Sequence, residues 1–339
     1  MIIVLDTNTL ISKNNKMITL NEGSGGKQMQ KLIEKIRDKL KLKDNWRNIN
    51  DDAATLKLKN INKNLVFTTD SYTVNPIFFP GGDIGKLALC GTINDLAVMG
   101  AKPAGISLAL VIEEGFSEDD LMKIIFSIGE VSKKTGIPVV TGDTKVMNKG
   151  GIDKIVINTS GIGFAKNIIS NSGLSASDKI IVSGSIGDHG IALLSKRFDY
   201  ETELVSDCAP VIKESRAVSK YVTAMKDPTR GGIAAVLNEM AEKSNVKIIL
   251  DEEKIPVKRE VAAVCELLGL SFYEIACEGR IVCGVKKEYA DKALKILKKF
   301  NNDSAIIGEV SKGRGVFVRT IVGMRPLEVP AGKLIPRIC

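Results

Sequence analysis

Residues 83–112 of the chain read Asp-Ile-Gly-Lys-Leu-Ala-Leu-Cys-Gly-Thr-Ile-Asn-Asp-Leu-Ala-Val-Met-Gly-Ala-Lys-Pro-Ala-Gly-Ile-Ser-Leu-Ala-Leu-Val-Ile. From Asp83 to Met99 the apolar residues recur at helical spacing, and the stretch from Ile106 to Ile112 is apolar apart from Ser107 and has the length of a strand. The helical stripe consists of Ile84, Leu87, Ala88, Ile93, Leu96 and Ala97. This stretch predicts a helix followed by a buried strand, which is a unit of mixed α and β structure.

Similar patterns extend over the rest of the chain. In the first half they predict helices at 28–40 and 117–134 and strands at 53–58, 65–69, 137–141 and 154–163. In the second half they predict helices from 188 and at 209–225, 231–243, 257–268 and 287–300, with strands at 179–183, 246–250, 280–285, 305–310 and 315–322. Strands and helices do not alternate strictly, which favours an α+β fold.

The Ser- and Asn-rich stretch 167–177 is typical of a linker and divides the chain into two domains, at 17–166 and 175–330. Residues 331–339 contain Gly332 and Pro336 and are expected to form an exposed, mobile tail. Residues 1–16 begin like the first strand of a PIN-type nuclease, but no such domain follows, so we interpret them as an N-terminal extension.

The composition excludes several classes of protein. Lys and Arg number 48 and Asp and Glu 40, for a net charge of +8, yet aromatic residues make up 5% of the chain and do not accompany the lysines. Nucleic-acid binding is therefore not expected. No apolar run approaches the ~18–20 residues of a membrane span, and the N-terminus lacks a secretory pattern. We expect a cytoplasmic protein that does not contact the membrane.

The six cysteines form no Cys-x-x-Cys pair, and His189 is the single histidine. A zinc site built from Cys and His is effectively excluded, and acid–base chemistry is expected to fall to Asp, Glu or Lys. A lone histidine at a predicted helix start is more often structural than catalytic. Cys339 is the last residue of the chain. A thiol in that position is not expected to pack in a core and can reach into the site of another protein.

Acidic residues give the clearest chemical signal. Asp51-Asp52, Asp70, Asp83, Asp95 and Asp143 each lie at a predicted strand end or helix start, beside small residues. Carboxylates in such places suit Mg²⁺, which takes oxygen ligands and bridges substrate phosphates. Gly23-Ser-Gly-Gly-Lys27 precedes a helix and offers backbone N–H groups to a phosphate, although it fits neither the Walker A nor the dinucleotide-binding pattern.

The sequence thus predicts a site for a nucleotide and Mg²⁺ in the first half. The expected metal ligands are Asp52, Asp70, Asp95 and Asp143. The residues expected to contact the nucleotide are Gly25, Gly26, Asp52, Thr69, Asp70, Asp83, Asn94, Asp95, Gly142, Asp143 and Thr144. The motif Asp227-Pro-Thr-Arg-Gly-Gly232 opens a predicted helix, and either a plain turn or a functional loop fits it.

Taken together, these motifs resemble one family. They are Gly23-Ser-Gly-Gly26, Asp51-Asp-Ala-Ala54, Phe67-Thr-Thr-Asp-Ser71, Phe79-Pro-Gly-Gly-Asp83, Gly91-Thr-Ile-Asn-Asp-Leu96, Thr141-Gly-Asp-Thr-Lys145, Asp227-Pro-Thr-Arg-Gly-Gly232 and the terminal Pro336-Arg-Ile-Cys339. Over about residues 17–339 the chain resembles the HypE family of carbamoyl dehydratases, within the AIR-synthase (PurM-like) superfamily. The Pro-Arg-Ile-Cys ending makes the resemblance specific to HypE.

The resemblance implies a two-domain PurM-like fold whose N-terminal domains pair into a dimer. It implies that Cys339 accepts a carbamoyl group from the carbamoyltransferase HypF. ATP then drives its dehydration to a thiocyanate, and the cyanide passes to iron on the HypC–HypD complex for [NiFe] hydrogenase. Lys145 and Glu278 match the expected catalytic positions. Cys277 and Arg280 depart from the usual Asn-Glu-Gly-Lys pattern around Glu278.

Two other interpretations remain open. A different superfamily enzyme, such as selenophosphate synthetase, thiamine-monophosphate kinase or AIR synthase, would keep the Gly and Asp motifs but would not explain the ending at Cys339. A non-enzymatic carrier would use Cys339 but would need no site for Mg²⁺ and ATP.

Overall fold

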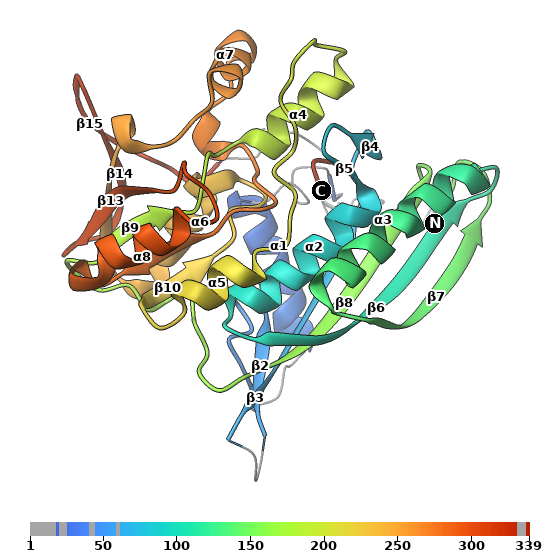
Figure 1. The fold of residues 1–339 in the computed structure, drawn as a ribbon, viewed down its shortest axis with the longest axis horizontal. Helices are drawn as coiled ribbons and strands as arrows, with labels where there is room; N and C mark the ends of the chain where they lie inside the picture. Colours follow the sequence, from blue (N-terminus) through green and yellow to red (C-terminus); the bar gives the residue numbers. More distant parts are fainter. Residues whose placement is uncertain (1–17, 20–25, 41–44, 59–61, 331–336) are drawn as a thin grey trace, which may run out of the picture.

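The computed structural model describes residues 18–19, 26–40, 45–58, 62–330 and 337–339. Two β-sheets organise the chain, one in each half, and helices lie against both (Figure 1). The expected N-terminal extension and residues 331–336 of the expected tail lie outside the described residues. Among the described helices, none has the combination of length and hydropathy that a membrane span requires.

The first sheet is built mainly from antiparallel strands. Its order is β1 (Trp46–Arg47), β2 (Ala54–Lys57), β3 (Asn64–Tyr72), β8 (Ile155–Ala165), β6 (Lys102–Glu113) and β7 (Val139–Met147). The edge pair β6–β7 is parallel. α2 (Ile84–Val98) packs on β3, β8 and β6, and α3 (Glu118–Thr135) packs on α2. The remaining elements of this half are α1 (Gly26–Leu40) and the small ribbon of β4 (Phe78–Phe79) and β5 (Gly82–Asp83).

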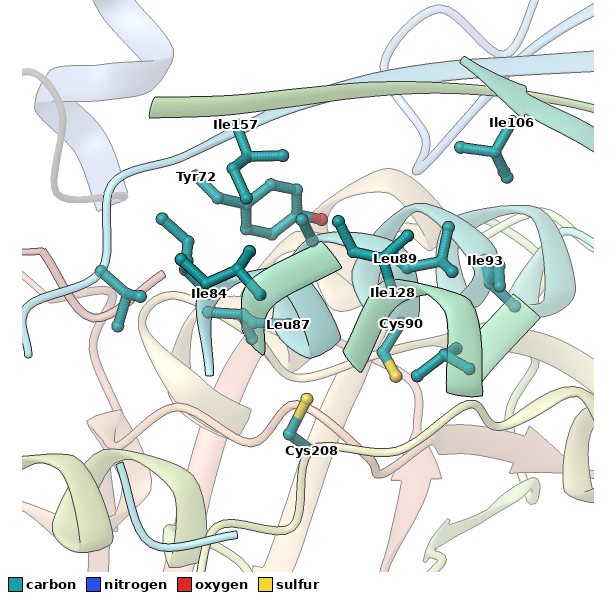
Figure 2. Packing of buried hydrophobic residues seen from close by; sticks show 14 of the residues in the cluster. Tyr72, Ile84, Leu87, Leu89, Cys90, Ile93, Ile106, Ile128, Ile157 and Cys208 are labelled. Carbon is teal, nitrogen blue, oxygen red and sulfur yellow. The ribbon is translucent and has the colours of Figure 1, made fainter. Parts of the chain in front are cut away.

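Helix α2 is buried on nearly every side rather than along the single predicted stripe. The sheet covers one side, and α3 together with α5 (Ile212–Val218) of the second half covers the others. In Figure 2, Leu89 lies beside Tyr72, whereas Cys90 points its sulfur toward Cys208 of the second half. A helix that is apolar all round is typical of a protein core, so α2 joins the two halves into one packed body.

The second sheet has the order β10 (Val222–Lys226), β12 (Val282–Val285), β9 (Lys179–Val182), β13 (Ala305–Ser311), β11 (Lys247–Asp251), β14 (Gly315–Thr320) and β15 (Gly323–Pro326). Its described strand pairs are antiparallel apart from β11–β14. The helices of this half include α4 (Asp188–Arg197), α6 (Gly232–Ser244), α7 (Arg259–Leu268) and α8 (Ala290–Leu297). Mainly antiparallel sheets with added helices confirm the predicted α+β class.

Three predicted elements need correction. The helix expected at 209–225 ends early, since α5 stops at Val218 and β10 begins at Val222. The β-branched Val222 and Thr223 favour an extended chain, which β12 pairs. Strands β3 and β7 extend beyond their predicted ends, so Asp70 and Asp143 lie within strands and not at their ends.

Three strands of the first sheet, β3, β7 and β8, carry exposed apolar side chains. Large apolar side chains on that sheet are exposed: Phe67, Val139, Val140, Val146, Met147, Ile162 and Phe164. Every residue of β7 is exposed. Exposed apolar side chains in this number favour an interaction surface around β7.

Candidate functional site

Three carboxylates converge where the two halves meet. Asp52 precedes β2, Asp95 lies in the last turn of α2, and Asp227 follows β10. One carboxylate oxygen from each lies within 4.8 Å of the others. Asp95 also faces the negative end of its helix dipole, an unfavourable place for an anion unless a cation is near.

Burial and mutual repulsion make the ionised form of this acidic cluster unfavourable when no cation is bound. Burial raises the pKa of Asp95 well above its usual range, and Asp70 and Asp227 raise it further. Burial, followed by the charge of Asp52, raises the pKa of Asp227 to about 7. The ammonium of Lys226 is ion-paired with Asp52 and offsets part of the charge.

The acidic cluster fits a divalent cation. Asp52 Oδ2 and Asp227 Oδ2 are buried without a hydrogen-bond partner among the described residues. Thr68 orients the third carboxylate, because its hydroxyl donates to Asp95 Oδ2 at 2.7 Å. An all-oxygen donor set with free lone pairs is what Mg²⁺ prefers.

This cluster differs from the predicted ligand set. It contains Asp52 and Asp95 as expected, but Asp227 takes the third place. Asp70 lies beside the cluster on β3, where its Oδ2 accepts from the hydroxyl of Tyr72 at 3.5 Å. Asp143 lies on β7, and β8 and β6 separate β7 from β3. Three strand spacings amount to roughly 14 Å.

The β7 residues stay apart from the acidic cluster in the single chain. Gly142, Asp143, Thr144 and Lys145 are all exposed, and Lys145 Nζ lies 3.4 Å from Asp143 Oδ2. Register places Asp143 in the same row as Ala109, Asn158 and Ser71 of the neighbouring strands. The hydroxyl of Thr69 lies among these outer polar groups, where it accepts from Ser160 Oγ at 2.9 Å.

Three other predicted residues have structural tasks in the described chain. Asp83 caps α2 by accepting from the backbone N–H groups of Gly85 and Lys86. Asn94 links the two halves, because its amide nitrogen donates to the carbonyl oxygens of Ala209 and Glu278. Gly26 begins α1 with a φ of +73°, and a Cβ there would clash with Pro330 O. Gly25 lies outside the described residues.

Glu278 borders the acidic cluster from the second half. Its side chain is 3% exposed, and Oε1 has no hydrogen-bond partner among the described residues. Burial raises its pKa well above the usual value, and the charges of Asp227 and Asp207 add to this effect. The unusual neighbour Cys277 has a role of its own, since its sulfur accepts from the N–H of Gly187 at 3.2 Å.

The end of the chain lies inside this site. Ile338 is 6% exposed, and Cys339 O accepts from the N–H of Thr73 at 3.4 Å. The expectation of an exposed tail is therefore wrong for residues 337–339, because backbone hydrogen bonds and apolar contacts hold them. Burial raises the pKa of the Cys339 thiol to about 12, whereas the positive charge of Arg230 acts in the opposite direction.

Sequence reasoning missed Asp227 and Arg230 as site residues, although their motif was in view. Arg230 supplies the positive charge that interacts with the Cys339 thiol. The pKa of the Arg230 guanidinium is raised mainly by the charge of Cys339, and the charges of Asp70 and Glu278 raise it further. Arg337 does not take this role. Its side chain donates to Thr73 O at 2.7 Å and ion-pairs with Asp153. The sequence signal that could have identified them is an Asp and an Arg three residues apart at a predicted strand–helix junction.

Known proteins resemble this chain in sequence and in fold. Residues 50–165 match the family described as AIR synthase related protein, N-terminal domain, and residues 175–321 match its C-terminal domain. The chain is 48% identical to a putative hydrogenase expression/formation protein of Methanocaldococcus jannaschii, over 95% of this chain and 99% of that protein. It is 41% identical to carbamoyl dehydratase HypE of Escherichia coli, over 95% and 99% of the two chains. The chain belongs to the HypE family.

Solved HypE structures agree with this assignment. A crystal structure of a HypE–HypF complex has a TM-score of 0.82 at 42% identity, over 88% of this chain and 99% of that one. HypE in complex with ATP has a TM-score of 0.79 at 36% identity, over 95% and 100%. Thiamine monophosphate kinase from Aquifex aeolicus, at 21% identity and a TM-score of 0.62 over 85% and 96%, shares the fold.

Proposed function

We propose that this chain is an ATP-dependent carbamoyl dehydratase of [NiFe] hydrogenase maturation. It converts a carbamoyl group, carried as a thiocarboxamide on Cys339, into a thiocyanate. The observation that carries the proposal is the docked position of Cys339, whose thiol shares a buried site with Arg230 and Glu278 beside the acidic cluster. HypE relatives at 37–42% identity, which bear the name carbamoyl dehydratase, support it.

The acidic cluster is proposed to hold Mg²⁺ through Asp52, Asp95 and Asp227, with Asp70 beside them. Mg–ATP, when bound there, would supply a phosphoryl group that makes the thiocarboxamide oxygen a good leaving group. The same cation would relieve the repulsion that raises the pKa of Asp95. A carrier that only presented Cys339 would need no such cluster.

Glu278 is the proposed base. Loss of water from the carbamoyl group removes its oxygen and the two protons of its nitrogen, so the site must accept protons. The raised pKa of Glu278 makes its carboxylate a stronger base than an ordinary glutamate. The guanidinium of Arg230 would stabilise negative charge that develops beside Cys339.

Carbamoyl acceptance requires a different position of the tail. With a pKa raised to about 12, the docked thiol is protonated at neutral pH and is a poor nucleophile. We propose that Cys339 accepts the carbamoyl group from HypF outside the site, returns for dehydration, and leaves again to deliver cyanide to the HypC–HypD complex. A solved HypE–HypF complex supports the first of these partners.

A homodimer is proposed to complete the site. The surface formed by β7 and its neighbouring strands carries exposed apolar side chains, and Asp143 and Lys145 lie on β7 itself. Pairing through this surface would bury the apolar residues and would bring the predicted nucleotide residues Gly142, Asp143 and Thr144 to the interface. Lys145 would then serve charge stabilisation or proton handling. We place this chemistry in the cytoplasm.

Intact-protein mass spectrometry tests the function. With HypF and its substrates, the chain should gain about 43 Da on Cys339, and addition of Mg–ATP should then remove about 18 Da as water leaves. Cys339→Ala should show neither change and should still bind ATP, because the acidic cluster is untouched. Cys265→Ala, which removes a buried thiol in α7, is the matched control and should behave as wild type. An adduct on another cysteine would contradict the proposal.

A further inference from the structure

The proposed chemistry does not use His189, the single histidine of the chain. This residue lies at the start of α4 and is fully buried. Its ring meets the ring of Phe79 edge to face, with centroids 5.3 Å apart. Burial lowers the pKa of His189, so the ring is neutral at neutral pH.

Both ring nitrogens of His189 have partners, and the partners fix their roles. His189 Nε2 lies 2.8 Å from the carbonyl oxygen of Ile338. A carbonyl oxygen can only accept, so Nε2 carries the hydrogen. His189 Nδ1 then accepts from the hydroxyl of Ser206 at 2.8 Å, and Ser206 Oγ accepts in turn from the N–H of Cys208 at 3.0 Å.

This chain of hydrogen bonds ends on the residue next to the acceptor cysteine. The neighbouring tail carbonyl groups also have donors: Arg337 O accepts from the N–H of Asn75 at 3.0 Å, and Cys339 O accepts from the N–H of Thr73. These two donors are backbone groups, which no substitution other than proline removes. The hydrogen bond to the Ile338 carbonyl, by contrast, comes from the side chain of His189, so a substitution of His189 can remove it.

Packing supports the same contact. The side chain of Ile338 lies against α4 beside Gly190, where an added Cβ would meet Ile338 Cδ1 at 3.0 Å. Arg197, at the other end of α4, donates to Arg337 O at 3.1 Å. One helix therefore contacts the tail at successive residues, and His189 supplies the contact nearest Cys339.

We infer that His189 is a positioning residue that latches the tail: its Nε2–H holds the Ile338 carbonyl and so keeps Cys339 in the dehydration site. The inference rests on the proposed function for its purpose, but the latch itself is a property of the protein without substrate. It predicts that loss of the latch affects dehydration and leaves carbamoyl acceptance intact, because acceptance takes place with the tail outside.

Alkylation of Cys339 by iodoacetamide tests the latch without ATP or a carbamoyl donor. His189→Asn places its amide near the Nδ1 position, which keeps Ser206 in reach and loses Ile338. His189→Gln places its amide near Nε2 and keeps a donor for Ile338. We expect Cys339 to be alkylated about 5- to 30-fold faster in His189→Asn than in wild type, and His189→Gln to recover most of the protection.

Two further variants keep the test decisive. Ser195→Ala removes from the same helix a buried hydroxyl that has no hydrogen-bond partner among the residues that the structure describes, and it should leave the alkylation rate at the wild-type value. Ser206→Ala removes the group that fixes the tautomer of the His189 ring, and it should accelerate alkylation less than His189→Asn does. This variant keeps the test available if His189→Asn fails to fold. Equal rates in wild type, His189→Asn and Ser206→Ala would overturn the inference. Equal acceleration by His189→Asn, His189→Gln and Ser195→Ala would overturn it too, because it would reflect loosening of α4.

The enzymatic consequence is measured separately by mass. His189→Asn should gain the carbamoyl group at the wild-type rate and then lose water more slowly by the same 5- to 30-fold factor. Faster alkylation with no dehydration in any variant, wild type included, would contradict the proposed function and leave the latch standing. Slower carbamoyl gain with unchanged dehydration would overturn the latch.

Discussion

The buried carboxylates of the acidic cluster and the exposed carboxylate of Asp143 on β7 differ in burial, in neighbours and in what they can bind. Asp52 and Asp95 lie in a buried cluster with Asp227, within 4.8 Å of one another. Asp143 lies on the exposed strand β7, beside the ammonium of Lys145 at 3.4 Å. Burial raises the pKa values of Asp52 and Asp95 and creates a need for a cation. Asp143, by contrast, is exposed and is accessible to a partner.

The largest expected difference between the groups is in binding of Mg–ATP. Asp227→Asn removes a charged ligand from the acidic cluster and should weaken binding by about one to three decades. Asp303→Asn, at an exposed loop of the second half, is the matched control and should have no effect. Isothermal calorimetry measures both affinities. Wild-type affinity in Asp227→Asn would remove Asp227 from the metal site.

The next expected effect is on stability without metal. The pKa of Asp227 is about 7 in the folded chain and 3.8 ordinarily, so the folded state binds more protons between these values. The free energy of unfolding should therefore fall as the pH rises from about 4 to 7, by up to a few kcal/mol. Urea denaturation in a chelator checks this, and Asp227→Asn should flatten the curve. Saturating Mg²⁺ should also reduce the loss, because the cation binds the charged form. A free energy that rises over this pH range would contradict the arrangement of the acidic cluster.

A third prediction concerns the outer face. Val140 is 62% exposed on β7, and Val140→Glu should shift the chain to a monomer in light scattering, because it adds a charge to the proposed interface. Ile321→Glu is the control, since Ile321 is 86% exposed in the second half. Asp143→Asn should weaken Mg–ATP binding in the dimer and should have no added effect in the Val140→Glu background. A dimer unaffected by Val140→Glu would place the interface elsewhere.

The smallest expected effect is on the stability of the outer group. Lys145→Met removes an exposed ion pair and should change the free energy of unfolding by less than about 0.5 kcal/mol in the monomeric Val140→Glu background. Lys226→Met removes the counter-ion of the buried cluster and should cost about 3–5 kcal/mol in a chelator. Urea denaturation compares the two, and similar losses would show that the groups are not as different as the structure indicates.

Sequence periodicity predicted the α+β class and most elements, because helical and strand spacing follow directly from which residues are apolar. It failed at 209–225, where the pairing of β10 with β12 decides a segment of mixed propensity. It also placed Asp70 and Asp143 at strand ends. An acidic residue is taken to end a strand when the sequence does not reveal that its side chain lies on an exposed side of the sheet.

Residue type and position alone indicated Asp52 and Asp95 as candidate ligands, and both lie in the acidic cluster. The roles of Glu278 and Cys339 came from the family resemblance and stay predictions. Asp227 was passed over because its approach to Asp95 joins residues of different halves, which no local pattern encodes. The docking of residues 337–339 was equally invisible, because the partners that hold them, such as Thr73 and His189, are distant in sequence.

One measurement tests the central claim most directly, namely that the docked Cys339, Glu278 and the acidic cluster form one dehydration site. Carbamoylated wild type and carbamoylated Glu278→Gln would be mixed with Mg–ATP and followed by intact mass over a single turnover. We predict that wild type loses about 18 Da and that Glu278→Gln, which keeps the size but not the base, retains its carbamoyl group. Loss of water at the wild-type rate in Glu278→Gln would contradict the claim.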